Sequence, residues 1–278
     1  TDGRYITSRV VGDMIYLIGE VSLDGIENES DMPAKASDIY HVDGEGGDYR
    51  LTEFAAINMS EADSEPSILH IVMAGSNNVL FTLDNIYITY TEYYYSGDYY
   101  WGGSSCEKTV VHRLAVDGID ITYAAMGEAD GSLLNRYCMD EHDGHLRLAT
   151  TSDVWSESHV TVMDMDLETV GALDGIAPGE RIYSARFIGD RGYVVTFRQV
   201  DPLFVIDLSN PEEPALLGEL KIPGYSTYLH PYDENHIIGI GKDTVDSENG
   251  NFAWYHGVKI ALFDVSNASN PKEVDSIV

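Results

Sequence analysis

The chain is poor in cysteine, in basic residues and in long apolar runs. Only two cysteines occur, Cys106 and Cys138, and they lie too far apart for a zinc-binding or redox-active pair. No apolar run approaches the roughly 18 residues of a transmembrane helix, so no membrane-spanning segment is expected. Lys and Arg number 16 against 47 Asp and Glu, which gives a formal net charge of −31. A chain this acidic repels nucleic acid and anionic lipid, and nucleic acid is therefore not expected as a partner.

The acidic residues are spread along the whole chain instead of being gathered in a tail. This distribution is typical of a solvated acidic surface in a medium rich in salt or divalent cations. Specific calcium sites and a basic protein partner are the two alternatives, and calcium sites are compatible with a salt-adapted surface. Because 44% of the residues are hydrophobic, the chain can also bury a large core.

Two segments near the C-terminus are close to being repeats of one another. Residues 204–211 and 262–271 each form a β-rich run that ends in an Asp and continues into a Ser-Asn…Pro turn. Each run also follows an apolar hairpin with polar residues at its turn. A repeated unit of four strands is the sequence signature of a β-propeller. The sequence therefore predicts an all-β fold and a single propeller domain over residues 1–278.

The strand and turn signals divide the chain into about five blades of four strands. Their approximate limits are residues 4–75, 76–130, 132–178, 181–224 and 225–278. In the third blade, the first strand is expected at residues 134–139. No strand is left over to close the ring by pairing with the other terminus. Either the ring closes by packing alone, or these blades are part of a larger propeller.

Long insertions fall repeatedly between the second and third strands of a blade, at residues 21–51, 93–107, 152–158 and 243–257. In a propeller these loops emerge on one face, which is the expected working surface. Cys106 ends one insertion and Cys138 lies near the start of a first strand that enters from the same face. A disulfide that tethers the insertion and a pair of free thiols both remain open.

Aromatic residues are concentrated in these insertions, where they would stack on sugars or partner side chains, or else fold back to cover the propeller. The aromatic candidates are Tyr94, Tyr95, Tyr99, Tyr100, Trp101, Trp155 and Trp254.

Arg9 and Arg186 occupy equivalent places in two first strands, the innermost strands of a propeller. There they would meet an anionic ligand or pair with Asp13 and Asp190.

Three carboxylates within one Gly-rich loop, Asp43, Glu45 and Asp48, are candidate calcium ligands, although a solvated loop has the same composition. Residues 140–145 contain two histidines and resemble a metal cluster, but they fall where a hairpin turn is expected. N-glycosylation signals occur at Asn28, Asn58 and Asn267. Calcium is thus the one possible cofactor.

Several segments of the chain resemble a family of secreted archaeal and bacterial β-propeller proteins. The resemblance is carried by residues 5–9, 139–141, 146–151, 179–208 and 218–233 and is loose over residues 21–107. It implies a propeller fold, export from the cell and a longer parent protein with further blades ahead of Thr1. It implies no catalytic residues.

The sequence has no G-x-S-x-G elbow, H-E-x-x-H motif or phosphate-binding loop, so enzymatic activity is not favoured. We expect an exported binding module that contacts a protein or carbohydrate ligand through its loop-rich face, at the cell surface or outside the cell. One alternative is an extracellular enzyme that acts on polysaccharide in the central funnel. Another is a structural subunit of a surface layer or filament.

Overall fold

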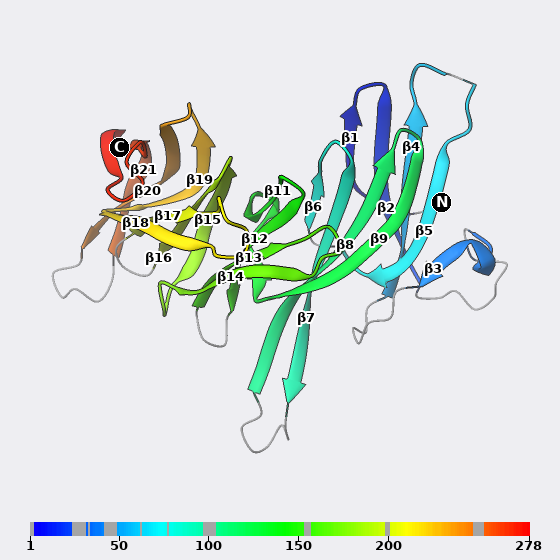
Figure 1. The fold of residues 1–278 in the computed structure, drawn as a ribbon, viewed down its shortest axis with the longest axis horizontal. Coiled ribbons are helices and arrows are strands. Elements are labelled where there is room, and N and C mark those ends of the chain that lie inside the picture. The colour runs from blue at the N-terminus through cyan, green and yellow to red at the C-terminus, as the bar shows by residue number, and fades with distance from the viewer. Residues whose placement is uncertain are drawn as a thin grey trace. The chain divides into compact units, whose positions relative to one another are not determined.

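The computed structural model describes residues 3–23, 32, 34–41, 49–61, 63–76, 78–96, 104–152, 157–197, 201–246 and 253–278, a few of them as backbone only. These residues form five sheets, which we number as blades 1 to 5 in chain order (Figure 1). The predicted all-β fold with about five blades is confirmed. No helix within these ranges is long and apolar enough to cross a membrane.

Apart from the short strand β3, the strands of each blade follow one another in sequence order, and the pairs of known register are antiparallel. Blade 1 contains β1 (Arg4–Val11), β2 (Met14–Ser22), β4 (Tyr49–Asn58) and β5 (Ser67–Ala74), followed at its edge by the short parallel strand β3 (Ile39–His41). The 3-10 turn η2 (Ala36–Asp38) precedes β3. Blade 2 contains β6 (Asn78–Phe81), β7 (Asn85–Ser96), β8 (Ser104–Asp117) and β9 (Asp120–Asp130).

In blade 3 the first strand is interrupted. The strands β10 (Ser132–Leu133) and β11 (Met139–His142) both pair with β12 (His145–Ser152), and the 3-10 turn η3 (Arg136–Cys138) lies between them. The strand expected at residues 134–139 is therefore largely a turn. The blade is completed by β13 (Glu157–Met163) and β14 (Thr169–Ile176).

The last two blades follow the regular plan. Blade 4 contains β15 (Arg181–Ile188), β16 (Arg191–Phe197), β17 (Asp201–Asp207) and β18 (Ala215–Ile222). Blade 5 contains β19 (Tyr225–Pro231), β20 (His236–Asp246), β21 (Ala253–Asp264) and β22 (Lys272–Ile277). All four predicted insertions contain some strand. The strands β7 and β8 extend into residues 93–107, and β20 and β21 extend into residues 243–257. Residues 21–51 contain β3 and the ends of β2 and β4, and residues 152–158 contain the ends of β12 and β13.

The repeated Asp-x-Ser sequence forms the same turn in blades 4 and 5. Asp207 Oδ1 accepts a hydrogen bond from the Ser209 N–H at 3.0 Å, and Asp264 Oδ1 accepts one from the Ser266 N–H at 2.9 Å. Hydrogen bonds from these serines lower the pKa of both carboxyl groups. A short side chain that binds the backbone two residues ahead initiates a turn, which explains why the pattern recurs at the ends of the third strands of blades 4 and 5.

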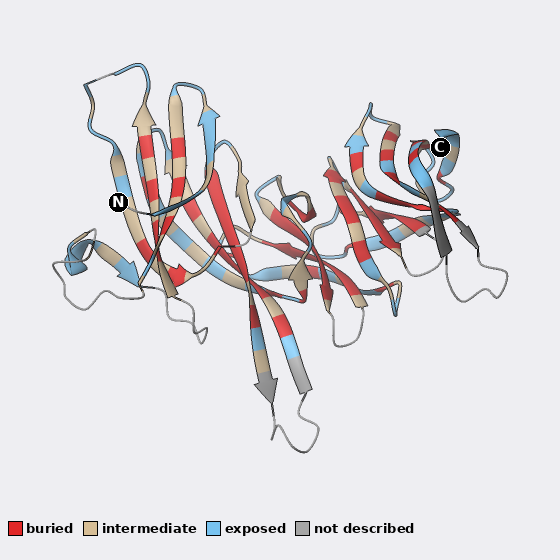
Figure 2. Ribbon diagram, turned by 180° about the vertical axis from the view of Figure 1, so that it is seen from behind, coloured by how far each residue is buried: buried red, intermediate tan, exposed pale blue. Residues whose placement is uncertain are grey.

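Contacts divide the chain into two compact units. Unit 1 comprises Thr1–Glu92 and Val110–Met126, and unit 2 comprises Tyr93–Thr109 and Gly127–Val278. In each unit, apolar side chains fill the space between adjacent blades, and the second and third strands carry most of the buried residues (Figure 2). Val194 and Val195 are neighbours in β16, yet both are buried, at 0% and 2% exposure, because a blade covers each face of the sheet.

Three glycines mark the places where one blade of unit 2 contacts the next. Gly127, Gly171 and Gly218 each lie in a fourth strand, opposite the backbone of the turn between the third and fourth strands of the following blade. A Cβ atom at any of these positions would lie less than 3.0 Å from that backbone. Only glycine permits this approach, so the contact depends on the absence of a side chain.

Replacing Gly218 by Ala is expected to lower the free energy of unfolding by about 1–3 kcal/mol, because the added methyl group forces the turn at Ala268 away from β18. Gly19→Ala is the matched control, since its Cβ would meet only the Arg4 carbonyl oxygen at an ordinary 3.5 Å. Urea denaturation midpoints of the two variants and the parent protein measure the difference. Equal midpoints for both variants would show that the close approach does not constrain the blades.

Candidate functional site

Five side chains gather on the first strands of blades 3, 4 and 5 in unit 2. We call them the first-strand cluster. They are Arg136 and Tyr137 in η3, Arg186 in β15, and Tyr228 and His230 in β19. All five are exposed or partly exposed. Because the first strand is the innermost strand of a propeller blade, these residues lie on the inner edges of blades 3, 4 and 5.

The turn η3 holds Tyr137 in place. Asn135 caps this turn, since its side-chain oxygen accepts a hydrogen bond from the Tyr137 N–H at 2.9 Å. The next residue, Cys138, is fully buried in the core between blades 3 and 4. Tyr137 is thus fixed between a capped residue and an anchored one, and its ring stays at the surface.

Both arginines of the cluster lie against the Tyr137 ring. The guanidinium carbon of Arg136 is 5.2 Å from the ring centroid and that of Arg186 is 5.3 Å from it. The Tyr228 ring meets the Tyr137 ring edge-on, with centroids 5.4 Å apart. The Tyr228 hydroxyl also lies 3.3 Å from His230 Nδ1. Cation–π and aromatic contacts therefore connect three blades in one continuous patch.

The cluster is positive within a strongly negative protein. Within the described ranges, no carboxylate lies within 4.0 Å of the guanidinium groups of Arg136 and Arg186, whereas Arg4 pairs with Glu20 and Arg147 with Asp140. The hydrogen bond from Arg136, together with the charge of Arg186, lowers the pKa of Tyr137. A patch with two arginines and no compensating carboxylate attracts anions.

The two arginines expected at equivalent places lie on different units. Arg186 belongs to the cluster, and Arg9 is exposed on β1 in unit 1. Arg186 does not form the ion pair with Asp190 that the sequence left open. Asp190 instead contacts His142, and Arg186 lies over an aromatic ring.

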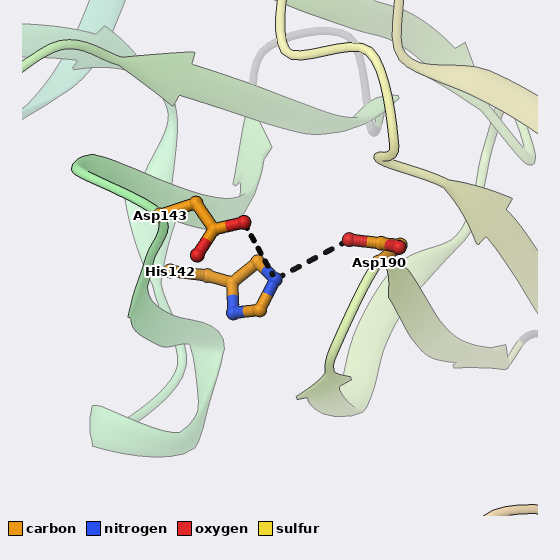
Figure 3. A group of neighbouring side chains, drawn as sticks. All are labelled: His142, Asp143 and Asp190. Atoms are coloured by element: carbon orange, nitrogen blue, oxygen red, sulfur yellow. Dashed lines mark hydrogen bonds and ion pairs between the residues drawn. The ribbon is translucent and has the colours of Figure 1, made fainter.

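A second group of polar side chains, His142, Asp143 and Asp190, lies where the hairpin turns of blades 3 and 4 meet (Figure 3). His142 Nε2 is 3.7 Å from Asp143 Oδ2 and 3.3 Å from Asp190 Oδ1. Asp143 and Gly144 both have positive φ, at 46° and 72°, as a two-residue hairpin requires. An imidazole and two carboxylates offer three ligand atoms to a divalent cation, but both carboxylates are largely exposed and already pair with the histidine.

Unit 1 contains a buried polar group that the sequence did not reveal. His112 is fully buried, with Nδ1 at 3.0 Å from the Tyr123 hydroxyl and Nε2 at 3.3 Å from the Tyr90 hydroxyl. Burial lowers the pKa of His112 to about 4 and raises the pKa of Tyr123 to about 12. A neutral imidazole donates through one nitrogen and accepts through the other, so the two phenols satisfy it.

Many of the predicted site residues lie outside the described residues or have no described side chain. Tyr94 is described, and its hydroxyl lies 3.3 Å from Glu128 Oε1. Asn58 ends β4 and Asn267 is exposed in a turn, so both remain predicted glycosylation sites. Those outside the description are Tyr99, Tyr100, Trp101, Trp155, Asp43, Glu45, Asp48 and Asn28, and the side chains of Tyr95 and Trp254.

The disulfide considered for Cys106 and Cys138 is not formed. Both residues are free thiols, with Cys106 exposed on β8 and Cys138 buried in η3. Of the two alternatives that the sequence left open, the structure has the free thiols, because the Cys138 side chain is buried in the core between blades 3 and 4.

Comparison with known proteins identifies the family. A family profile described as "Beta propeller domain" matches residues 1–278. The chain belongs to this family. An uncharacterised protein of Methanocaldococcus jannaschii is 47% identical over 174 residues, which are 61% of this chain and 26% of that protein. One of Archaeoglobus fulgidus is 48% identical over 167 residues, 60% of this chain and 25% of that protein. The β-propeller chain therefore spans about a quarter of the length of the curated relatives it matches.

The two thiols of the propeller are expected to differ in reactivity. Burial raises the pKa of Cys138 to about 11, so at neutral pH this residue has almost no thiolate and no access for a reagent. In the native protein a thiol-specific reagent should label only Cys106, and after unfolding it should label both residues. Mass spectrometry of labelled peptides checks this. Rapid native labelling of Cys138 would contradict its burial.

The buried histidine predicts a specific pH dependence of stability. Below pH 6.5 the unfolded chain protonates His112 while the folded chain keeps it neutral, so stability falls as the pH drops from 6.5 towards about 4. The loss from this residue approaches about 1.4 kcal/mol per pH unit. Denaturation curves of the parent protein and of His112→Gln at several pH values separate the contribution of His112 from that of the carboxylates. An unchanged slope in the variant would assign the pH dependence to other groups.

Proposed function

We propose that this β-propeller is a binding module that recognises an anionic group at the first-strand cluster. A single observation carries the proposal: Arg136 and Arg186 both lie over the Tyr137 ring without a carboxylate partner among the described residues. In a chain with 47 acidic and 16 basic residues, arginines left uncompensated side by side are unexpected unless their charge is used.

The chemistry of the cluster indicates the class of ligand. A guanidinium group donates two parallel hydrogen bonds to a carboxylate, sulfate or phosphate. The Tyr137 and Tyr228 rings offer flat surfaces on which a sugar or another ring stacks. The net charge of −31 opposes polyanions at long range, which favours a ligand with few charges. An acidic saccharide combines these properties.

We also propose that the module acts outside the cell, at the cell surface or in the medium. The resemblance to secreted propeller proteins and the acidic surface support this location. The exposed Asn267 in its glycosylation signal is compatible with it. Acidic saccharides are common in that setting, so the location and the ligand class agree.

Isothermal titration with glucuronate tests the proposed binding, with glucose as the uncharged control. Glucuronate should bind saturably and glucose should not. Arg186→Gln should weaken glucuronate binding about tenfold or more, because it removes a charge-assisted hydrogen bond worth roughly 1.5–3 kcal/mol.

Arg181→Gln is the matched control, since it removes the same charge from an exposed residue of the same strand, β15. We expect it to change the affinity less than about twofold. If both variants lose affinity equally, binding depends only on net charge. If glucuronate does not bind at all, the proposed function is wrong.

A further inference from the structure

The first and second strands of blades 1, 3 and 4 are joined by turns of the same length, two residues. The last paired residue before the turn is Val11 in blade 1, His142 in blade 3 and Ile188 in blade 4. Val11 and Ile188 are partly buried and pack against the apolar cluster that their blade shares with the next blade in the chain. Blade 3 therefore has an imidazole at a position where blades 1 and 4 have an apolar side chain.

Blade 3 departs from this plan at the next position as well. The first residue of the turn is Gly12 in blade 1 and Gly189 in blade 4, with φ of 58° and 52°, whereas blade 3 has Asp143 with φ of 46°. A positive φ is disfavoured for a residue that carries a side chain. The two consecutive departures of blade 3 thus introduce an imidazole and a carboxylate, which are both common metal ligands.

These two side chains meet a third one from the following blade (Figure 3). Asp190 lies in the turn between β15 and β16 of blade 4, and its Oδ1 is 3.3 Å from His142 Nε2, while Asp143 Oδ2 is 3.7 Å from the same nitrogen. Zinc binds nitrogen and oxygen ligands at about 2.0–2.2 Å, so neighbouring ligand atoms of a tetrahedral site lie about 3.3–3.6 Å apart. Both distances from the imidazole nitrogen are close to this spacing.

The group is unusual within the part of the chain that the structure describes. Its three ligand atoms all lie within 4.8 Å of one another, and no other group of three His, Cys, Asp or Glu side chains among the described residues meets this condition. The three residues come from two adjacent blades of unit 2, so the packing of blade 3 against blade 4 brings them together.

The three side chains do not satisfy one another fully. His142 Nε2 carries at most one hydrogen, which it donates to one carboxylate at a time, yet two carboxylates converge on it. Within the described ranges, no Lys or Arg nitrogen lies within 4.0 Å of Asp143 or Asp190 to balance their charges. A divalent cation balances both charges and takes a lone pair from each of the three ligand atoms.

We propose that His142, Asp143 and Asp190 form a binding site for a divalent transition-metal ion of the zinc class, which bridges the hairpin turns of blades 3 and 4. The imidazole nitrogen favours zinc, cobalt or nickel over calcium and magnesium, which prefer oxygen ligands. Three protein ligands leave the remaining coordination positions to water. The site is separate from the first-strand cluster and does not rest on the proposed anion binding.

Isothermal titration with zinc chloride in an excess of calcium chloride tests the site. The calcium occupies carboxylates that bind any divalent cation, which is necessary in a chain with 47 acidic residues. The parent protein should bind zinc saturably in this background. His142→Gln removes the imidazole, and Asp190→Asn removes the carboxylate of blade 4 with little change in size. Each should weaken zinc binding about tenfold or more, because each removes one of three ligands.

His236→Gln is the matched control, because His236 lies beside the equivalent turn of blade 5 and also pairs with an aspartate. Its Nδ1 is 2.9 Å from Asp233 Oδ1, but among the described residues no second carboxylate completes a group of three ligands there. We expect this variant to change the zinc affinity less than about twofold. Circular dichroism of each variant verifies that the fold is retained.

Three results would overturn the proposal. One is a parent protein that does not bind zinc saturably in the calcium background. Another is unchanged zinc affinity in Asp190→Asn, which would show that the ion does not bridge the two blades. The third is an equal loss of affinity in His236→Gln and His142→Gln, which would assign zinc binding to histidines in general.

Discussion

The burial of both faces of the middle strands is the constraint on which the rest of this structure depends. The second and third strands carry apolar residues on both faces, as Val194 and Val195 do in β16. A single twisted sheet of four strands cannot bury both of its faces, so each blade is stable only against a neighbour. The inter-blade glycines, the repeated Asp-x-Ser turns and the placement of the first strands side by side all serve that stacking.

The sequence predicted the fold because the decisive signals are local. Strand periodicity and the turn chemistry of Asp207 and Asp264 are encoded within a few residues, and they recur at a fixed spacing. Only part of the first-strand cluster around Tyr137 could be predicted from the sequence. Arg186 was identified from its first strand, but Tyr137 lies in a 3-10 turn, and its contact with Tyr228 depends on how three blades pack. The predicted face of the fold could not decide whether Cys106 and Cys138 form a disulfide, because the answer depends on the direction of the Cys138 side chain, which lies in the core.

The first-strand cluster and the acidic surface act over different distances. The net charge of −31 creates a long-range field, and salt screens that field beyond a Debye length of about 8 Å at physiological ionic strength. In the proposed function, the guanidinium groups of Arg136 and Arg186 would act on a ligand in direct contact, where screening is weak. An acidic protein thereby keeps its solubility and still offers a local positive site, provided that the surrounding medium contains enough salt.

The glycines between blades also bear on how a chain of this kind changes in length. Because Gly127, Gly171 and Gly218 each lie closest to a backbone carbonyl oxygen, each contact depends little on which side chains the following blade carries. Duplication or deletion of a whole blade leaves such a junction intact, whereas a point mutation at the glycine destroys it. Gene duplication is therefore a low-risk route to new blade numbers in this protein, and the glycines are the positions that must be inherited with each copy.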